Sequence, residues 1–366
     1  MPAAEATSGD GLRVAFYTDA KERGGAEVSL RTLLAHLPAD VEATVVGVDA
    51  GLLEWVASGR PGTGTEVVPE VRGKGSLGPI LAHRQVLARL RPDVVHVNLT
   101  EMADARWAVL AATTLGHPRV VAVEHLPLAP SVRSTVLLKR LGSRRLAAHV
   151  AVGERAARAT EQAIGLPAGS VRTIHNGVPD DVTIPPRAAG QHVVLGTLAR
   201  LDPIKGLDLL VAAVSRLAGV RLLVVGDGPE RSALEAQVHQ LGLSDRVELR
   251  PWGDQGRRSL AEMDIFVLPS RNEGLPLSVI EAMLASRPVV ASDVGSVREA
   301  VVDDETGYLV PAGDLESLTR SLAVLVADPI GRSRMGAAGR ERALDQFTAS
   351  RMAAAYAALY REVAAG

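Results

Sequence analysis

The run SRNEGLPLSVIEAM places two carboxylates, Glu273 and Glu281, on either side of an expected helix start. Pro276 suits the first turn of a helix, where its missing N–H costs nothing. Gly274 and Leu275 would then offer free backbone N–H groups, which bind anions at a helix N-terminus. A lone carboxylate such as Glu281 on an apolar helix is costly unless it is paired or hydrogen-bonded. Two carboxylates at a helix start that faces a cleft could therefore hold the hydroxyls of a polyol. The alternative is that Glu273 only caps the helix and Glu281 is solvated.

Two cations stand on either side of a second turn, in the run GTLARLDPIKGLDLL. Arg200 follows a strand-like segment, and Lys205 precedes the next helix, so both side chains can point to the same space. A planar guanidinium and a compact ammonium at a strand end suit a diphosphate. Only four of the 40 basic residues are lysines, which favours a specific role for Lys205. The alternative is a solvated turn with ordinary surface cations.

Two glycine-rich turns and one histidine add polar groups at expected strand ends. The run RGGAE places Gly24 and Gly25 where a turn meets the first helix, and backbone amides there suit an anion or a hydroxyl. The run VVGDGPER is a weak nucleotide fingerprint and equally fits a plain strand-to-helix turn. A lone histidine is more often structural, but His125 is the best placed of the nine for contact with a substrate, because it follows the strand-like run RVVAVE.

Composition and missing motifs exclude several classes of protein. Acids (42) and bases (40) nearly cancel, so no general attraction to nucleic acid is expected. The absence of cysteine excludes disulfides and thiolate sites. There is no Asp-x-Asp, P-loop, G-x-S-x-G or H-E-x-x-H motif, which favours a metal-free site that relies on cations and helix ends. The N-terminal run lacks a signal-peptide pattern, and no apolar run reaches the length of a membrane span, so we expect a cytoplasmic protein.

The elements that must position these residues alternate between strand and helix. Near-continuous apolar strands separated by helical runs predict an α/β protein with parallel sheets covered on both faces. The chain of 366 residues is too long for one ordinary core, and the Pro- and Asp-rich run 178–191 suggests a linker. We expect one domain over residues 1–180 and another over 190–347, with 348–366 crossing back to the first. Two doubly wound domains facing each other would form a cleft at their carboxyl strand ends.

Five runs in one order make the chain resemble a known family. They are TIHNGV, RLDPIKG, VVGDGPER, the E-x7-E spacing of Glu273 and Glu281, and SVREAVVDDETGYLVPAGD. The chain resembles retaining glycosyltransferases of the GT-B fold, in family 4 (group 1), over essentially its whole length. That fold has two Rossmann-like domains facing across a cleft. One departure is His175, where the family commonly has proline.

The resemblance implies roles for two groups of residues. The expected catalytic residues are Glu273, Lys205, Arg200 and His125. The expected donor-binding residues are Gly274, Leu275, Glu281, Gly24, Gly25, Arg250, Trp252 and Asn176. Arg200 and Lys205 would hold the departing diphosphate, Glu273 would contact the donor sugar, and residues 250–253 would lie by the base. Glu281 would take the ribose hydroxyls.

The implied activity is transfer of a hexosyl-type sugar from a nucleoside-diphosphate sugar, with UDP favoured as the commonest family case. The acceptor would be a hydroxyl of a small molecule, a lipid precursor or a sugar, and neither a metal nor another cofactor would be needed. The basic, leucine-containing run 131–146 could touch anionic lipid, although a solvated face or a phosphate-bearing acceptor site is favoured. The alternatives are a nucleotide-sugar 2-epimerase of the same fold and a non-catalytic sugar-binding protein.

Overall fold

The computed structural model describes residues 11–71, 77–101, 105–127, 133–180, 184–185, 187, 190, 192–253 and 256–366. The chain divides into two compact units. Unit 1 takes Met1–Ala151, Ala157–Ile174 and Met352–Gly366, and unit 2 takes Val152–Ala156 and His175–Arg351. The expected linker, 178–191, falls in part outside the described residues.

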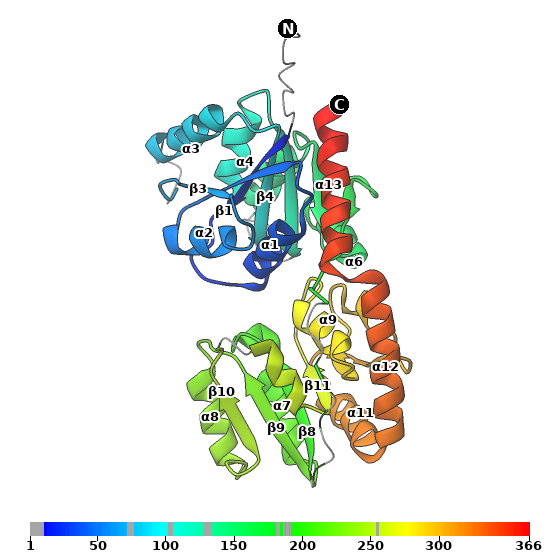
Figure 1. The fold of residues 1–366 in the computed structure, drawn as a ribbon. Helices are drawn as coiled ribbons and strands as arrows, with labels where there is room; N and C mark the ends of the chain where they lie inside the picture. The colour runs from blue at the N-terminus through cyan, green and yellow to red at the C-terminus, as the bar shows by residue number, and fades with distance from the viewer. Residues whose placement is uncertain are drawn as a thin grey trace. The chain divides into compact units, whose positions relative to one another are not determined.

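Unit 1 is built on a parallel sheet in the order β3-β2-β1-β4-β5-β6-β7 (Figure 1). Its strands are β1 (Leu12–Thr18), β2 (Val41–Gly47), β3 (Gly64–Val67), β4 (Val94–Glu101), β5 (Arg119–Leu126), β6 (Ala148–Ala151) and β7 (Val171–Thr173). Its helices are α1 (Gly25–His36), α2 (Ala50–Ala57), α3 (Leu77–Leu90), α4 (Arg106–Thr113), α5 (Arg133–Ser143), α6 (Glu154–Ile164) and α13 (Ala349–Ala365). The first residues of α6 and α13 are counted with unit 2.

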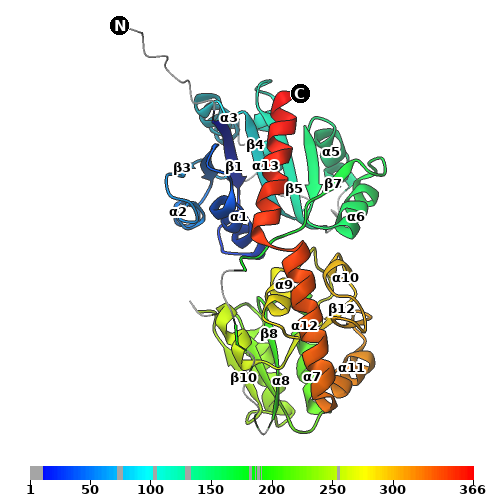
Figure 2. The same cartoon turned by 45° about the vertical axis from the view of Figure 1, so that its right-hand side comes forward.

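The C-terminal helix α13 lies over the middle of the unit 1 sheet (Figure 2). The Tyr360 hydroxyl lies 2.7 Å from Nδ1 of His96 on β4, and the Tyr360 ring meets Phe16 of β1 edge-on. All three side chains are buried. A buried histidine and a buried phenol are costly unless hydrogen-bonded, so this contact anchors the helix to the sheet.

Unit 2 repeats the plan with a parallel sheet in the order β10-β9-β8-β11-β12-β13. Its strands are β8 (Val193–Leu198), β9 (Val220–Val225), β10 (Val247–Arg250), β11 (Ile265–Leu268), β12 (Val289–Ser292) and β13 (Gly307–Val310). Its helices are α7 (Leu207–Ser215), α8 (Arg231–Gln240), α9 (Leu277–Leu284), α10 (Val297–Ala300), α11 (Leu315–Ala327) and α12 (Pro329–Gln346), and its 3-10 turns are η1 (Pro203–Lys205) and η2 (Gly256–Glu262). The expected pair of parallel α/β sheets is confirmed.

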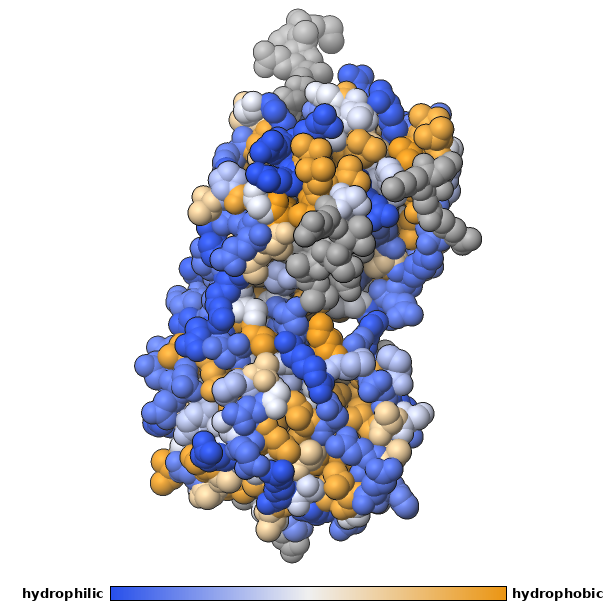
Figure 3. All heavy atoms as spheres, turned by 180° about the vertical axis from the view of Figure 1, so that it is seen from behind, coloured by the Kyte–Doolittle hydropathy of each residue, from blue (hydrophilic) through white to orange (hydrophobic). Residues whose placement is uncertain are grey.

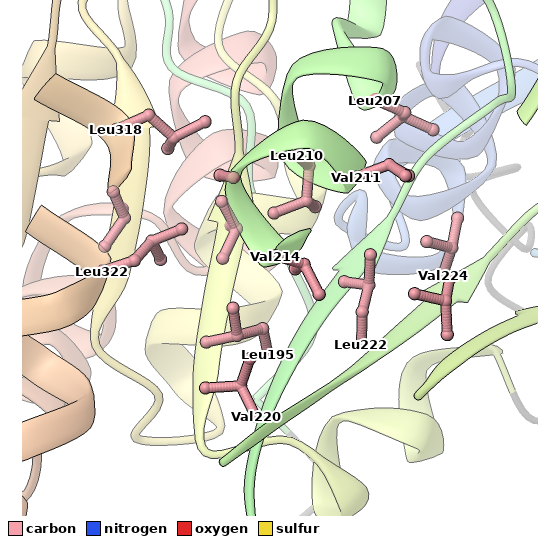
Figure 4. Packing of buried hydrophobic residues seen from close by; sticks show 14 of the residues in the cluster. Leu195, Leu207, Leu210, Val211, Val214, Val220, Leu222, Val224, Leu318 and Leu322 are labelled. Carbon is pink, nitrogen blue, oxygen red and sulfur yellow. The ribbon is translucent and has the colours of Figure 1, made fainter. Parts of the chain in front are cut away.

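The core of unit 2 forms where α7 and α11 pack on the sheet. Val214 of α7 points toward Leu222 of β9, and Leu210 of α7 and Leu318 of α11 belong to the same buried cluster (Figure 4). Each of these side chains is at most 1% exposed. The helical spacing of Leu207, Leu210 and Val214 places them on one face of α7, which is why this segment folds as a helix against the sheet.

The face seen in Figure 3 carries hydrophobic side chains in separate spots among hydrophilic ones. Within the described residues, no helix combines the length and the apolar character that crossing a membrane requires. Helix α5, in the run considered for lipid contact, exposes Leu137, Leu138 and Leu141 by 57%, 58% and 49%. Ser131 and Val132 of that run lie outside the described residues.

Lys139 of the same helix turns inward instead of contributing to a basic surface. Its Nζ lies 2.6 Å from Oε1 of Glu124, which also lies 2.9 Å from Nε2 of His149. The Glu124 side chain is fully buried, and that of Lys139 is 12% exposed. Burial by itself would raise the pKa of Glu124, but Lys139 and His149 hold it down at about 2.

Glu124 should therefore make the stability of unit 1 depend on pH. Its folded pKa lies below the unfolded value, so its contribution is present above about pH 4.5 and is lost as the pH falls toward 2. The shift corresponds to a contribution on the order of 3 kcal/mol. We expect the stability difference between the wild type and Glu124→Gln to shrink between pH 5 and pH 2.5 in urea titrations. A difference that does not change with pH would contradict the pairing.

The unit 2 core offers a test of its own. Leu210→Ala should lower the free energy of unfolding by about 2–5 kcal/mol, because it opens a cavity under α7. Val324→Ala on α11 is the control, since Val324 is 46% exposed. Guanidinium unfolding can be followed through Trp252 alone in a Trp55→Phe, Trp107→Phe background, because only Trp252 lies in unit 2. Equal effects of the two substitutions would show that this packing is not as described.

Candidate active site

The candidate site of unit 2 lies where the order of its strands reverses. The chain runs outward from β8 through β9 to β10 on one side, and from β11 through β12 to β13 on the other. The turns after β8 and β11 are therefore neighbours at the carboxyl edge of the sheet, the position at which doubly wound sheets bind ligands. The backbone N–H of Arg271 donates to the carbonyl of Ile204 over 2.7 Å and joins these turns directly.

The turn after β11 is held by its carbonyl groups. The carbonyl of Gly274 accepts the N–H of Ser296 over 2.8 Å, and that of Leu275 accepts Nδ2 of Asn176 over 2.9 Å. Gly295, at φ +51°, packs so closely on Glu273 that a Cβ would lie 1.8 Å from its carbonyl oxygen. The bond from Ser296 fixes the peptide group that carries the Leu275 N–H, and the close approach of Gly295 to the Glu273 carbonyl restricts the peptide group that carries the Gly274 N–H.

The N–H groups of Gly274 and Leu275 have no acceptor among the residues that the structure describes. Both residues are buried, and Leu275 is only 2% exposed. Buried N–H groups are nearly always paired, so two adjacent unpaired donors mark a place for an acceptor. Pro276 lies one residue earlier than expected, as the N-cap of α9 rather than in its first turn. The two donors therefore immediately precede the helix, where its dipole also favours an anion.

Lys205 and Glu273 are brought together from the two turns. Nζ of Lys205 donates to Oε1 of Glu273 over 2.7 Å, and the same oxygen accepts the hydroxyl of Ser270 over 2.7 Å. The Glu273 side chain is 6% exposed and that of Lys205 is 23% exposed. The ammonium thus lies beside the carboxylate that precedes these two N–H groups, and among the described residues Oε2 of Glu273 has no hydrogen-bond donor.

Arg200 lies in the same turn but pairs with its neighbour. Its guanidinium donates to Oδ2 of Asp202 over 2.5 Å, and its side chain is 58% exposed. Asp202 also caps η1 by accepting the N–H of Ile204. The pKa of Asp202 is lowered, since burial is outweighed by the hydrogen bonds from Arg200 and Ile204 and by the charge of Lys205. The turn therefore holds two cations and one carboxylate.

The glycines of the GDGP run bring the backbone of two turns into contact. A Cβ at Gly226 would lie 1.9 Å from the carbonyl oxygen of Ala199, and one at Gly228 would lie 2.3 Å from that of Leu201. The carbonyl of Asp227 accepts the N–H of Leu201 over 2.8 Å. These glycines therefore support the turn that carries Arg200 and Lys205, which agrees with the plain-turn interpretation of this run.

A cavity of about 160 Å³ lies at the carboxyl ends of β9 and β10. Its lining residues are Val225, Arg250, Pro251, Gly253, Gly256, Arg258, Ser259 and Glu262. The Arg250 guanidinium bonds to Glu262 over 2.7 Å and to Glu248 over 2.9 Å, and these bonds raise its pKa. The expected residues Arg250 and Gly253 thus line a cavity, although the charge of Arg250 is already paired. Trp252 is 52% exposed, and its backbone N–H donates to Oδ2 of Asp227 over 2.7 Å.

Glu281 and Asn176 complete the expected residues of unit 2. Glu281 is half-buried in the second turn of α9, where burial raises its pKa and the charge of Arg257 opposes that rise. Asn176 is 5% exposed, and its amide supports the carbonyl of Leu275. Beside it, Nε2 of His175 lies 2.8 Å from Oε2 of Glu299.

Gly24, Gly25 and His125 lie in unit 1, whose strand order reverses between β1 and β4: the two glycines follow β1, and His125 lies on β5, the strand next to β4. Gly24 is the N-cap of α1, and its N–H donates to Oε2 of Glu27 over 3.3 Å. A Cβ at Gly25 would meet nothing within 4 Å. His125 lies inside β5 rather than after it, because the strand continues to Leu126. Its Nε2 lies 2.8 Å from Oδ1 of Asn98.

Several residues of these sites were not singled out from the sequence. In unit 2 they are Ser270, Asp202, Asp227 and Ser296, and in unit 1 they are Glu27 and Asn98. Ser270 and Asp202 stand within three residues of an expected site residue, so proximity in the motif was a usable signal. Asn98 lies 27 positions from His125, and no local pattern joins them. Among the described residues, no group of three or more metal-ligating side chains lies close enough to hold a metal ion.

Gly206 offers a test of how tightly the two turns are joined. It has φ +63°, and a Cβ there would lie 2.2 Å from the carbonyl oxygen of Pro269. Gly219 is the matched control, because it has φ +69° but nothing within 4 Å of a Cβ. Gly219→Ala should cost about 1 kcal/mol of backbone strain, and Gly206→Ala about 1–3 kcal/mol more. Guanidinium unfolding followed through Trp252 measures both, and equal losses would contradict the close approach.

Two family models match most of the chain. The model described as Glycosyltransferase Family 4 matches residues 23–182, and the model described as Glycosyl transferases group 1 matches residues 192–328. Among solved structures, Anabaena HepE in complex with UDP has a TM-score of 0.83 at 20% identity and covers 96% of this chain and 100% of its own. Sucrose-phosphate synthase from Thermosynechococcus elongatus has a TM-score of 0.82 at 21% identity, covering 97% and 99%. These structures show the GT-B fold with its two Rossmann-like domains, as expected.

Relatives of known name include several glycosyltransferases. The 2-deoxystreptamine glucosyltransferase of Streptomyces kanamyceticus is 31% identical over 309 residues, which is 80% of this chain and 77% of that protein. The lipopolysaccharide core biosynthesis glycosyltransferase LpsE of Rhizobium meliloti (strain 1021) is 35% identical over 163 residues. This match covers 44% of this chain and 48% of that protein. The matches to two further glycosyltransferases cover 40% and 45% of those proteins. The chain thus spans about half or less of the length of LpsE and of these two relatives. The extended match to the first of these proteins, together with the two family models, shows that the chain belongs to the group 1 glycosyltransferases of family 4.

Proposed function

We propose that the chain transfers a hexosyl-type sugar, with retention of configuration, from a nucleoside-diphosphate sugar to a hydroxyl acceptor. The observation that carries this proposal is the pair of unpaired N–H groups at Gly274 and Leu275, beside the Lys205 ammonium. Donors fixed before the reaction stabilise charge that develops as a bond breaks, because they need not reorganise. A departing diphosphate gains negative charge in that step and is the group that such donors fit.

Glu273 has the position to bind the sugar rather than the phosphates. A carboxylate repels a diphosphate but accepts hydrogen bonds from hydroxyls. Its Oε1 is shared by Lys205 and Ser270, and its Oε2, which no donor of the described residues contacts, would take a sugar hydroxyl. Lys205 would thus bridge the carboxylate and the phosphate, which places the bond between sugar and phosphate next to both. We assign Glu273 as a residue of the site and not as a nucleophile.

The remaining donor contacts follow along the same edge of the sheet. The cavity lined by Val225, Arg250 and Gly253 is smaller than the ~300 Å³ of typical ligand pockets, so it would hold only the base. Glu281, half-buried in α9, would accept the ribose hydroxyls. Arg200, which is 58% exposed, would turn from Asp202 toward the phosphates when a donor binds.

Similar proteins support a uridine nucleotide. HepE has been solved with UDP, with UDP and glucose, and with UDP-glucose. The names of two relatives specify 2-deoxystreptamine and D-inositol 3-phosphate, both of which offer hydroxyl acceptors. We therefore propose a UDP-sugar as donor and a small polyhydroxylated molecule, a lipid precursor or a sugar as acceptor. We further propose that the two cations and the N–H groups stabilise the diphosphate without a metal.

Removal of Lys205 tests the site. Lys205→Ala should lower kcat by about 10²–10³-fold, as loss of one preorganised donor does elsewhere. Arg216→Ala is the control, because Arg216 is an exposed cation of the same unit that pairs with Glu316. UDP release from UDP-glucose is measured with a panel of acceptors that includes 2-deoxystreptamine and inositol phosphate, with and without EDTA. Before this, UDP, GDP and ADP are ranked by thermal stabilisation.

The outcomes separate the alternatives. Normal turnover by Lys205→Ala would contradict the assignment of the site. Conversion of UDP-glucose to another nucleotide sugar without an acceptor would identify an epimerase. Nucleotide-sugar binding with no UDP release for any acceptor would point to a binding protein. Loss of turnover on adding EDTA would overturn the proposal that no metal is needed.

A further inference from the structure

A buried polar network in unit 1 joins the Gly24 turn to His125. Its centre is Glu27 on α1, which is 1% exposed, and Asn98 on β4, which is 2% exposed. Oε1 of Glu27 accepts the Thr18 hydroxyl over 3.2 Å and Nδ2 of Asn98 over 3.4 Å. Oε2 accepts the N–H of Gly24 over 3.3 Å. On its other side, Oδ1 of Asn98 lies 2.8 Å from Nε2 of His125.

The direction of each hydrogen bond in this network can be worked out from its outer members. A backbone N–H can only donate, so Oε2 of Glu27 must accept from Gly24. The Thr18 hydroxyl accepts the N–H of Ala20 over 3.3 Å and donates its own proton to Oε1 of Glu27 over 3.2 Å. Both oxygens of Glu27 are thus surrounded by donors, as a carboxylate requires. Burial nevertheless raises the pKa of Glu27, against the hydrogen bonds that lower it.

The orientation of the Asn98 amide determines which of its atoms faces His125. An amide has a donating end and an accepting end, so an Asn98 that gives its N–H to Glu27 presents its oxygen to His125. The Nε2 atom of His125 must then carry a proton. Burial lowers the pKa of His125 to about 4, so the ring is neutral near pH 7 and its Nδ1 bears a lone pair.

Other groups near Asn98 do not change these hydrogen-bond directions. His96 lies two residues before Asn98 on β4, and its Nδ1 lies 2.7 Å from the Tyr360 hydroxyl. Burial lowers the pKa of His96 to about 3, so it brings no charge. Glu124 precedes His125 along β5, and its side chain is bound to Lys139 and His149.

We propose that Glu27 is a positioning residue that fixes, through Asn98, the tautomer of His125 with its proton on Nε2 and a bare Nδ1. A bare ring nitrogen accepts a hydrogen bond from a hydroxyl and repels an oxyanion. Resting on the proposed function, in which the family resemblance puts His125 near the transferred sugar, a bare Nδ1 would suit a hydroxyl of the sugar or of the acceptor and not a phosphate. Glu27 also holds the N–H of Gly24, so one carboxylate sets both the glycine turn and the histidine.

A purely structural role for Glu27 makes a different prediction. As a capping residue, Glu27 needs only to accept the N–H of Gly24. Glu27→Gln keeps that acceptor but places an NH₂ group where Oε1 was, next to Thr18 and Asn98. The Asn98 amide must then turn its oxygen toward residue 27 and its N–H toward His125. Nε2 of His125 becomes the acceptor, and the ring proton moves to Nδ1.

The tautomer is measured directly by long-range ¹H–¹⁵N spectra of the full chain with ¹⁵N-labelled histidine near pH 7. The His125 signals are assigned with His125→Asn. We expect Nε2–H in the wild type, Nδ1–H in Glu27→Gln, and a mixture in Asn98→Ala. Glu54→Gln is the matched control, because Glu54 is exposed on α2, and it should leave the signals unchanged. A wild-type proton on Nδ1, or unchanged signals in Glu27→Gln, would overturn the proposal.

Two further features keep this test decisive. If Glu27→Gln fails to fold, the wild-type spectrum still shows which nitrogen of His125 carries the proton. The Asn98→Ala spectrum then shows whether Asn98 determines that choice. The spectra need no substrate, so they stand whether or not the chain transfers a sugar. Where UDP-glucose turnover is found, Glu27→Gln should lower kcat/KM by about tenfold or more and Glu54→Gln should not, because a misdirected group at the reacting centre is costly. A changed tautomer with unchanged turnover would confine Glu27 to a structural role.

Discussion

The burial of carboxylates organises both units of this molecule. A carboxylate removed from water is tolerated only where cations or hydrogen-bond donors replace the lost solvent. Glu273, 5% exposed, meets this requirement through Lys205 and Ser270. Because these partners come from different turns, satisfying one side chain ties together the carboxyl ends of β8 and β11. The N–H groups of Gly274 and Leu275, which have no acceptor among the described residues, then lie beside a cation that cannot move away without depriving the buried carboxylate of its positive partner.

The same requirement is met in unit 1 by different chemistry. Glu124 is paired with a cation, Lys139, and its pKa falls to about 2. Glu27 is surrounded by the neutral donors of Thr18, Gly24 and Asn98, and its pKa rises. An ion pair outweighs the cost of burial, whereas neutral hydrogen bonds here do not. The difference suits separate tasks, since Glu124 anchors a helix while Glu27 sets the direction of a hydrogen-bonded chain.

Glycines serve the site chiefly by letting backbones approach. At Gly226, Gly228 and Gly295 a Cβ would fall within 2.3 Å of a neighbouring carbonyl oxygen. Each of these contacts brings one turn against another at the carboxyl edge of the unit 2 sheet. Gly25 is different, because a Cβ there would meet open space. Motif glycines thus divide into those that pack the turns and those that leave room beside a helix start.

The sequence by itself determined the elements and the family. The runs 77–90 and 154–164 have the periodicity of a helix in the sequence, and α3 and α6 have these bounds, because the pattern of a helix is local. Short α2 and β3 were not expected, since eight and four residues carry little periodic signal. The five motifs, in order, were sufficient to identify the group 1 glycosyltransferases.

Only the tertiary structure decided which groups meet. Asn176 donates a hydrogen bond to the carbonyl of Leu275, 99 positions away. The guanidinium of Arg250 is already paired with Glu262 and Glu248. Lys139 looked like part of a basic surface but is turned inward to Glu124. The sequence lists the charges and amides, but the partner of a buried polar group depends on which strands become neighbours. That order is a property of the folded sheet and of no local stretch of the chain.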